Sequence, residues 1–340
     1  MAEKIACVMV PSPAHGYPGH PEAPERFSGF GRLKEAPFAD RLDWLPFRPA
    51  SVEEIQAAHT PELVEFLQEA CRQGPAIIDG APTYVTQASW QAALDAAGGA
   101  LACARAVLRG EASAGLALVR PPGHHAERDR AMGFCLLNNL AIAVYAALSM
   151  GLERVLVVDF DVHHGNGTED IFWREERVAF LSTHQWGIYP GTGSLEEAAH
   201  ARGRIVNVPL PARAGDRAFA QILETVIRPL AASVRPQALF VSAGFDAHWS
   251  DPLASLGLST GGFYRLSRGL VELAEEFCEG KQVCVLEGGY HPECLADGCL
   301  ALAAALAGQE EPGDPTGPTP NPEPDVRPLL ERVRAYHDLH

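Results

Sequence analysis

Three residues that can bind a metal ion alternate along one short stretch of the sequence. Asp159, Asp161 and His163 occupy every second position of VDFDVHHGNGT, directly after the apolar run Val155 to Val158. In an extended chain, side chains two residues apart lie on the same face, and buried carboxylates need an ion or a hydrogen-bonding partner. A polar turn that ends the strand is the simpler alternative. The alternation of Asp with His favours a metal site.

Asp246, in GFDAH, supplies a third candidate ligand beside Asp161 and His163. Three protein ligands leave one position for water and substrate, which is typical of catalytic zinc. Two carboxylates and one imidazole also suit iron(II), so zinc is the first expectation and iron the second. The alternative for Asp246 is a helix N-cap.

Side chains suited to proton transfer accompany these ligands. His124 and His125 follow a Pro-Pro-Gly turn, and a neutral imidazole takes and returns protons near neutral pH. Asp159 is the expected carboxylate partner of one of them, although solvent-exposed bystanders are the alternative. Tyr290 follows Gly288–Gly289, where a substrate can approach closely, and its phenol could donate to an oxyanion. An ordinary structural tyrosine is the competing interpretation.

The elements that must position these residues form an alternating pattern. Short apolar runs predict strands at Ile5 to Val10, Leu116 to Val119, Val155 to Val158, Val178 to Leu181, Ala238 to Val241 and Val283 to Leu286. Helix-compatible segments are Ser89 to Leu108, Leu140 to Met150, Ala218 to Ser233 and Gly262 to Phe277. The pattern predicts a single-domain α/β fold with a mostly parallel sheet covered by helices on both faces. Four polar clusters directly follow strands, so we expect them to meet at the carboxyl edge of the sheet.

The end of the chain has a different composition. Residues 1–310 form the expected catalytic domain, and residues 311–325, EPGDPTGPTPNPEPD, have the proline content of a linker. Residues 326–340 carry apolar side chains at helical spacing and predict a short amphipathic helix. This helix could dock on the body of the chain or on another subunit, so a homo-oligomer is possible.

Net charge, cysteine spacing and the absence of targeting segments in the sequence argue against several classes of partner and location. The formal net charge of -16 argues against a nucleic acid or an anionic membrane surface as partner. The eight cysteines show no C-x-x-C pair, which favours reduced, buried thiols over a disulfide framework or a thiolate zinc site. The start of the sequence lacks the pattern of a signal peptide, and no apolar stretch reaches membrane-spanning length. We therefore expect a cytoplasmic protein.

Five motifs in this order, RPPGHHA, GFCLLNN, DFDVHHGNGT, SAGFDAH and LEGGY, resemble the zinc-dependent histone deacetylase family, with acetylpolyamine amidohydrolases and acetoin-utilisation proteins as relatives. The resemblance runs from about Ala6 to Leu306. It implies an arginase-like fold and zinc ligands at the three metal-binding candidates above. By the same resemblance, His125 is the general base and acid, His124 is its electrostatic partner, and Tyr290 polarises the carbonyl.

The resemblance also indicates a branch of the family and further sites. Asn166 matches class II members, where class I members have aspartate, and the uncharged amide should leave His125 less basic. Arg26, in HPEAPERF, resembles the class II arginine that lines an inner cavity below the metal, with a surface salt bridge as the alternative. His164 is expected behind His163. A potassium site is implied at Asp159, Asp161, His163, Ser182 and Thr183.

The resemblance implies an acyl tunnel walled by Phe134 and Tyr189, the latter standing where phenylalanine is more usual. The Tyr189 phenol could bind a polar acyl or linker group, although simple van der Waals contact is the preferred interpretation. Gly288 and Gly289 leave room beside the tunnel, and Leu253 lies on its rim. Leu253 replaces an acidic residue of polyamine-specific relatives. Pro82 stands where many relatives grip the substrate backbone with aspartate, and Asp79 is the residue that could compensate.

The predicted function is a metal-dependent amidohydrolase that removes an acetyl or other acyl group from an amine such as acyl-lysine. Acetylpolyamines and small-metabolite amides are alternative substrates. Two rivals differ in class: an arginase-like ureohydrolase with two manganese ions, and a catalytically inert binder of acylated ligands. The ureohydrolase requires additional bridging aspartates, and a complete set of catalytic residue types argues against the inert binder.

Overall fold

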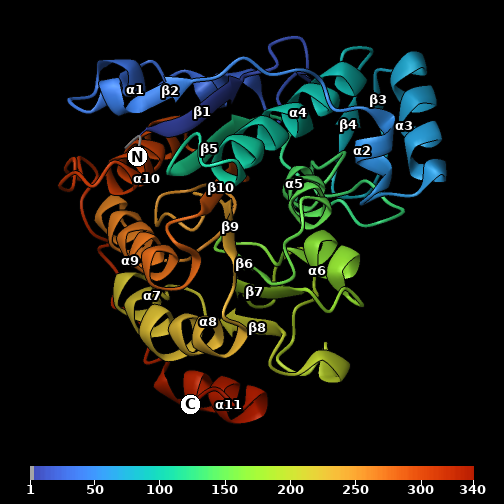
Figure 1. Cartoon of the computed structure of the whole chain (residues 1–340). Helices are drawn as coiled ribbons and strands as arrows, with labels where there is room; N and C mark the ends of the chain where they lie inside the picture. The colour runs from blue at the N-terminus through green and yellow to red at the C-terminus, as the bar shows by residue number, and fades with distance from the viewer. Residues whose placement is uncertain (1–3) are drawn as a thin grey trace.

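One eight-stranded sheet runs through the centre of the computed structural model, which describes residues 4–340 (Figure 1). Its strands lie in the order β2 (Leu42–Trp44), β1 (Ile5–Val10), β5 (Ala114–Val119), β10 (Gln282–Leu286), β9 (Ala238–Ala243), β6 (Val155–Asp159), β7 (Val178–Gln185) and β8 (Ile205–Leu210). Every neighbouring pair is parallel. A short antiparallel hairpin, β3 (Ala76–Ile77) and β4 (Tyr84–Val85), stands apart. The predicted parallel α/β sheet is confirmed.

Alternating side chains of the buried strands enter two separate hydrophobic cores. In β6, Leu156 and Val158 belong to one core, whereas Val155 and Val157 belong to the other. All four are fully buried. A strand covered on both faces needs apolar residues at every position, which explains the continuous apolar runs in the sequence.

Helices cover both faces of the sheet, as Figure 1 shows. The helix bounds are α1 (Arg32–Glu35), α2 (Val52–Gln56), α3 (Pro61–Gln73), α4 (Ser89–Leu108), α5 (Asn139–Ser149), α6 (Asn166–Phe172), α7 (Asp216–Ile222), α8 (Arg228–Val234), α9 (Thr260–Cys278), α10 (Pro292–Leu306) and α11 (Arg327–His337). Helices α4 and α5 pack together against one face, whereas α9 and α10 pack together on the other. The helix predicted from Ala218 to Ser233 is divided by a π-helical turn at Leu223–Ile227.

The edge strand β8 was not predicted from the sequence. Its run Ile205–Leu210 contains Pro209, and proline removes a backbone donor that a central strand requires. At the edge of a sheet the missing donor costs nothing, because β8 pairs only with β7. The segment forms a strand because it lies at the edge of the sheet, which its composition does not reveal.

The C-terminal helix α11 packs on the body of the same chain, against β8 and the π-helical turn. Leu330, Val333 and Leu339 are buried at this contact. The proline-rich segment before α11 contains no helix or strand. It is nevertheless anchored, because the Glu323 carboxylate accepts hydrogen bonds from the backbone N–H groups of Gly215, Arg217 and Ala218 at 3.1 Å each. The division of the chain into a catalytic domain (residues 1–310), a linker (311–325) and a C-terminal helix (326–340) stays a prediction.

All eight cysteines are free thiols with buried side chains. Burial raises the pKa of Cys284 to about 12, so this thiol stays protonated in the core. In residues 4–340, no helix is long and apolar enough to cross a membrane.

Candidate active site

The polar clusters meet at the carboxyl edge of the sheet, as the strand pattern predicts. The segments that contribute follow β5, β6, β9 and β10, which are neighbours within the sheet. Parallel strands present all their carboxyl ends on one edge, so residues 124, 161, 246 and 290 come together although they are distant in sequence. The scattered motifs form one site.

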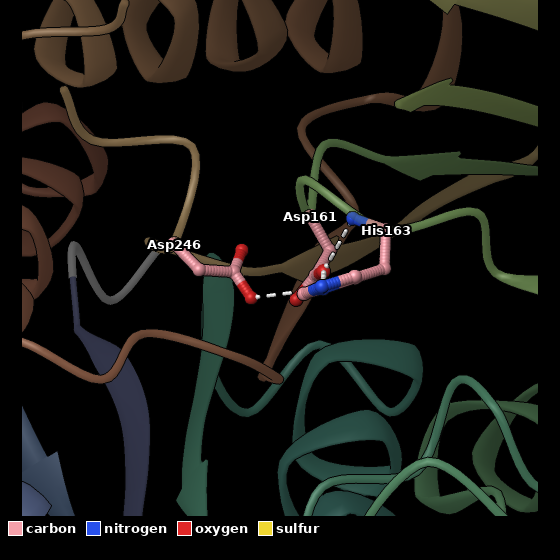
Figure 2. Close-up of side chains that lie close together, drawn as sticks. All are labelled: Asp161, His163 and Asp246. Atoms are coloured by element: carbon pink, nitrogen blue, oxygen red, sulfur yellow. Dashed lines mark hydrogen bonds and ion pairs between the residues drawn. The ribbon is translucent and has the colours of Figure 1, made fainter. Parts of the chain in front are cut away.

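Asp161, His163 and Asp246 converge at this edge (Figure 2). One ligand atom from each lies within 4.8 Å of the others. The Nδ1 atom of His163 is 3.1 Å from Asp161 Oδ1 and 3.3 Å from Asp246 Oδ2. Two ligands at about 2.0–2.2 Å from a tetrahedral zinc ion lie roughly 3.3 Å apart, so these separations fit one ion.

An unsatisfied oxygen also points to an ion. Asp246 is fully buried, and its Oδ2 atom accepts no hydrogen bond from residues 4–340; its ion-pair partner is His163 Nδ1 at 3.3 Å. Its other oxygen accepts a hydrogen bond from the backbone N–H of Val162 at 3.0 Å, which orients the carboxylate. Burial, and then the negative charge of Asp161, raise the pKa of Asp246. A buried carboxylate with one oxygen that accepts no hydrogen bond is costly unless a cation lies beside it.

Glycine is required where the loop after β10 passes the metal ligands. The Gly288 N–H donates to Asp161 Oδ2 at 2.8 Å, and a Cβ at this position would collide with the carboxylates of both Asp246 and Asp161. Gly289 has φ +125°, a conformation that L-residues rarely adopt. These two glycines let the backbone approach the ligands and turn toward Tyr290.

Each of the two adjacent histidines has its own partner. The Nδ1–H of His124 donates to Asp159 Oδ2 at 3.0 Å, as expected from the sequence. The Nδ1 of His125 lies 2.7 Å from Asn166 Oδ1. Both imidazoles are almost fully buried. These hydrogen bonds fix the orientation of both rings, which is what a proton-transfer pair requires.

The two imidazoles experience opposite electrostatic environments. Burial acts to lower the pKa of His124, but the carboxylates of Asp161 and Asp159 outweigh it and raise this pKa well above the ordinary value. Burial and the positive charges of His124 and His163 lower the pKa of His125 well below the ordinary value. The two adjacent imidazoles therefore differ in their affinity for a proton, because His124 faces carboxylates and His125 faces other imidazoles.

A cavity of about 270 Å³ opens onto these groups. Its lining residues are Ala81, Pro82, His125, Gly133, Phe134, His163, Tyr189, Leu253 and Tyr290. The rings of Phe134 and Tyr290 are 5.7 Å apart, and those of His125 and Tyr189 are 5.1 Å apart. Burial raises the pKa of Tyr290 well above its usual range, so its hydroxyl stays a hydrogen-bond donor.

Two side chains, Arg26 and Asp251, form hydrogen bonds with the backbone around Tyr290. Arg26 is buried and donates from Nε to the Gly289 carbonyl at 2.7 Å and from Nη2 to the Glu287 carbonyl at 2.6 Å, so the surface salt bridge considered for it is wrong. Asp251 Oδ2 accepts from the backbone N–H of Tyr290 at 2.7 Å. Arg26 lines a separate cavity of about 630 Å³ that Tyr290 also borders.

The rim contains Leu253 and Pro82 as expected, but Asp79 is already engaged. Its Oδ1 accepts from the backbone N–H groups of Ala81 and Thr83 at 3.1 and 2.6 Å, and its Oδ2 accepts from Gly133 at 3.2 Å. Asp79 therefore orders the loops beside Phe134, and its role toward a substrate backbone stays a prediction. The buried Tyr189 hydroxyl has no hydrogen-bond partner in the described chain.

The residues expected at a second cation site also lie together. Asp159 and Ser182 are register partners in β6 and β7, and the Thr183 hydroxyl donates to the Asp159 carbonyl at 3.3 Å. Asp159 Oδ1 accepts from the Asp161 N–H at 3.0 Å. His164 points away from the ligand cluster, since its ring nitrogens contact Thr192 Oγ1 at 2.8 Å and Glu169 Oε2 at 3.0 Å.

The sequence did not single out two supporting carboxylates. Glu287 is buried and accepts from the backbone N–H groups of Gly123 and His124 at 2.6 and 3.0 Å, which fixes the histidine loop. Its position directly after β10 was the signal that could have found it. Glu127 accepts from the Asn166 amide at 2.8 Å, and no spacing in the sequence indicates this contact.

Fold and site together define a parallel α/β protein with a candidate metal centre beside a histidine pair. The chain matches the model of the histone deacetylase domain over residues 20–306. It is 42% identical over 298 residues to a probable deacetylase of Archaeoglobus fulgidus, covering 86% of this chain and 82% of that protein. It is 37% identical to the histone deacetylase-like amidohydrolase of Pseudomonas aeruginosa, covering 85% and 77%.

The likeness extends to solved structures. The crystal structure of the HDA15 HD domain superposes with a TM-score of 0.88 at 32% identity, covering 99% of this chain and 95% of that domain. The chain is also 36% identical to histone deacetylase 10, chloroplastic, of rice, Oryza sativa subsp. japonica, covering 97% and 80%. This chain belongs to the histone deacetylase family, with the arginase-like deacetylase fold, and is a hydrolytic enzyme of the deacetylase type. The resemblance inferred from its motifs is confirmed.

Proposed function

We propose that this protein is a zinc-dependent amidohydrolase that removes an acetyl or other acyl group from an amine such as the side chain of acyl-lysine. The observation that carries the proposal is the 270 Å³ cavity, which brings His163, His125 and Tyr290 to one space. A metal ligand, a base and a phenol donor are the groups that amide hydrolysis requires. Membership of the family supports acylated amines as the class of substrate.

Asp161, His163 and Asp246 would hold the metal ion. Their separations and the Asp246 oxygen that accepts no hydrogen bond support this assignment. A zinc ion bound there supplies Lewis-acid polarisation of the scissile carbonyl and acidification of water. Iron(II) is the second candidate because the ligand set does not discriminate strongly. We also propose potassium at the site formed by Asp159, Asp161, His163, Ser182 and Thr183.

The side chains of this site divide the proton transfers. His125 takes the proton of the attacking water, because its Nδ1 is engaged by Asn166 and its Nε2 is left as the acceptor. Tyr290 donates its hydroxyl proton in a hydrogen bond to the developing oxyanion. His124, held by Asp159, provides positive charge beside the reacting centre, and the proton held by the histidine pair passes to the departing amine.

The cavity wall favours a neutral acyl chain. Phe134, Tyr189 and Leu253 offer aromatic and apolar surface, and none of the residues that line the cavity is a carboxylate. A polyamine carries several positive charges, which such a wall does not compensate. We therefore rank acyl-lysine, whose side-chain amide is neutral, above acetylpolyamines, which keep positive charge on their remaining amines. The strongly negative formal charge supports a small acylated amine, and no nucleic acid, as partner.

The test is an activity panel with zinc-loaded protein. Fluorogenic acyl-lysine peptides of increasing acyl length and acetylpolyamines are compared for kcat/KM, and the metal is counted by mass spectrometry. We expect one catalytic metal per chain and turnover of acyl-lysine that is lost in His125→Ala. Two manganese ions per chain would favour a ureohydrolase. Binding of acyl-lysine without turnover would favour an inert binder.

A further inference from the structure

The orientation of the Asn166 side chain decides which nitrogen of His125 is available as a base. An asparagine side chain has an acceptor oxygen and a donor nitrogen of similar shape, so it can present either end to a neighbour. The structure places Asn166 Oδ1 toward His125 Nδ1 at 2.7 Å. In this orientation Nδ1 must carry the proton. The Nε2 atom is then left without a proton.

The reverse orientation would have the opposite effect. An Asn166 amide turned by 180° would point its N–H donors at Nδ1, and Nδ1 would have to accept. The proton of a neutral His125 would then lie on Nε2. This tautomer cannot take a proton from water, so one amide rotation separates a competent base from an incompetent one. An aspartate at position 166 would not face this problem, because both of its oxygens are acceptors.

Glu127 is the group that distinguishes the two ends of the amide. Its Oε1 accepts a hydrogen bond from Asn166 Nδ2 at 2.8 Å. A carboxylate has no donor, so it pairs with the NH₂ end of the amide and would repel the oxygen end. The sulfur of Met132 lies 3.5 Å from the same Nδ2 and is only a weak acceptor. The negative charge of Glu127 is therefore the main cause of the observed orientation.

Glu127 is itself held by the surrounding loops. Its backbone N–H donates to the Arg130 carbonyl at 2.9 Å, and Arg130 Nε lies 3.9 Å from Oε2. The Glu127 carbonyl contacts His59 Nδ1 at 2.9 Å, while His59 Nε2 accepts from the Asn138 N–H at 2.8 Å. Because Nε2 accepts, His59 carries its proton on Nδ1 and donates it to Glu127. These two hydrogen bonds fix the backbone of Glu127, and Arg130 is an ion-pair partner of its carboxylate.

We propose that Glu127 is a positioning residue that selects the Asn166 amide orientation and, through it, the Nδ1–H tautomer of His125. The role rests on the proposed function of His125 as the base. Glu127 does not reach the 270 Å³ cavity; it borders a separate cavity of about 630 Å³ together with Asn166 and His164. It therefore acts without touching the substrate.

The first test compares variants of position 127 in the zinc-loaded enzyme. We expect Glu127→Ala to lower kcat about tenfold at an unchanged KM, the effect of losing one orienting hydrogen bond. Glu127→Gln keeps an acceptor oxygen but loses the charge and gains an amide donor that can face the Asn166 oxygen, so its kcat should fall between those of Glu127→Ala and the wild type. Asp129→Ala is the matched control, since it removes an exposed carboxylate from the same turn. A Glu127→Ala enzyme with wild-type kcat would overturn the proposal.

The second test asks whether the effect passes through the amide. In an Asn166→Asp background, either carboxylate oxygen can accept the hydrogen bond from His125 Nδ1, so the rotation of this side chain no longer matters. Glu127→Ala should then not lower kcat relative to Asn166→Asp alone; because it also removes the carboxylate that faces the aspartate at this position, kcat should stay equal or rise. A tenfold loss in both backgrounds would mean that Glu127 acts by another route, and the proposal would be wrong.

A spectroscopic readout separates this proposal from the proposed function. Two-bond ¹H–¹⁵N correlation spectra of ¹⁵N-histidine protein report the tautomer of each imidazole, with His125 assigned by comparison with His125→Gln. We expect the Nδ1–H form in the wild type and a mixture in Glu127→Ala. Unchanged tautomers would refute the role of Glu127. Inactivity of the wild type on every amide, with the tautomer shift present, would refute only the proposed function.

Discussion

Two clusters of buried charged side chains differ in the source of the positive charge that balances their carboxylates. In the first, which we name the arginine cluster, the Glu22 carboxylate lies between Arg120 and Arg26. Arg120 donates from Nε and Nη2 to its two oxygens at 2.5 and 2.8 Å, and Arg26 Nη1 donates at 3.2 Å. All three side chains are at most 1% exposed, so the chain itself closes this cluster. Burial opposes the charge of Glu22, but Arg120 and then Arg26 lower its pKa to about 2.

The second cluster, Asp161, His163 and Asp246, is not closed by the chain. No arginine or lysine donates to it among the interactions of the described residues, and the Oδ2 atom of Asp246 accepts no hydrogen bond and has only His163, at 3.3 Å, as an ion-pair partner. The comparison teaches how to separate structural from functional buried charge. A carboxylate that the fold pairs fully stabilises the fold, whereas one that it leaves open requires a ligand from outside.

The largest expected effect comes from Asp246→Asn. The amide preserves the acceptor for Val162 but removes the charged ligand, so we expect loss of stoichiometric zinc and at least about a thousandfold fall in kcat/KM. In metal-free protein the same change removes one of two facing buried carboxylates, so the free energy of unfolding should stay equal or rise. Metal analysis and chemical denaturation measure the two effects. Retained zinc would contradict the assignment of Asp246 as a ligand.

Glu22→Gln should lower the free energy of unfolding, in contrast to Asp246→Asn. It leaves the buried charge of Arg120 without a full counter-charge, and we expect a loss of about 3–5 kcal/mol in the free energy of unfolding. Glu69→Gln is the control, because its partner Arg72 is 70% exposed and such surface pairs contribute about 0–1 kcal/mol. Urea denaturation at neutral pH measures both. Equal losses in the two variants would remove the distinction between the closed cluster and a surface pair.

Tyr290→Phe isolates the oxyanion donor from the metal ligands. The variant should keep its metal and lose about a hundredfold in kcat, since the ring still packs beside Phe134 but no longer donates a hydrogen bond. Tyr264→Phe, on a helix away from the site, controls for the loss of a phenol. Steady-state kinetics on the best substrate of the panel gives the answer. Unaltered turnover would exclude Tyr290 as the donor.

The smallest effect is the acid sensitivity of the arginine cluster. The pKa of Glu22 is lowered from 4.5 to about 2, so its contribution to stability is complete above pH 4.5 and is lost as the pH falls toward 2. Each pH unit below 4.5, the ordinary pKa of glutamate, should lower the free energy of unfolding by roughly 1 kcal/mol until the pH reaches about 2. The difference in unfolding free energy between the wild type and Glu22→Gln should therefore shrink in acid. A constant difference would show that Glu22 titrates normally.

Much of the fold could be predicted because β6 and its neighbours are buried on both faces. A strand of this kind has a continuous apolar run, which is visible in one sequence. The same reasoning missed β8, whose Pro209 is tolerated only because the strand lies at an edge. It also did not find the division of the segment after Asp216 by a π-helical turn. Neither the place of a strand in the sheet nor local helix geometry is encoded in spacing alone.

By itself, the sequence determined which chemically capable side chains are available: two carboxylates and an imidazole as candidate ligands, a histidine pair, and a phenol after two glycines. Local rules suffice for this, because each motif follows its own strand and parallel strands end at one edge. Only the tertiary structure decided which oxygen of Asp246 accepts no hydrogen bond, that Arg26 is buried, and that Glu127 orients Asn166. These depend on contacts between segments distant in the chain, and hydrogen-bond direction and burial exist only once those segments are packed together.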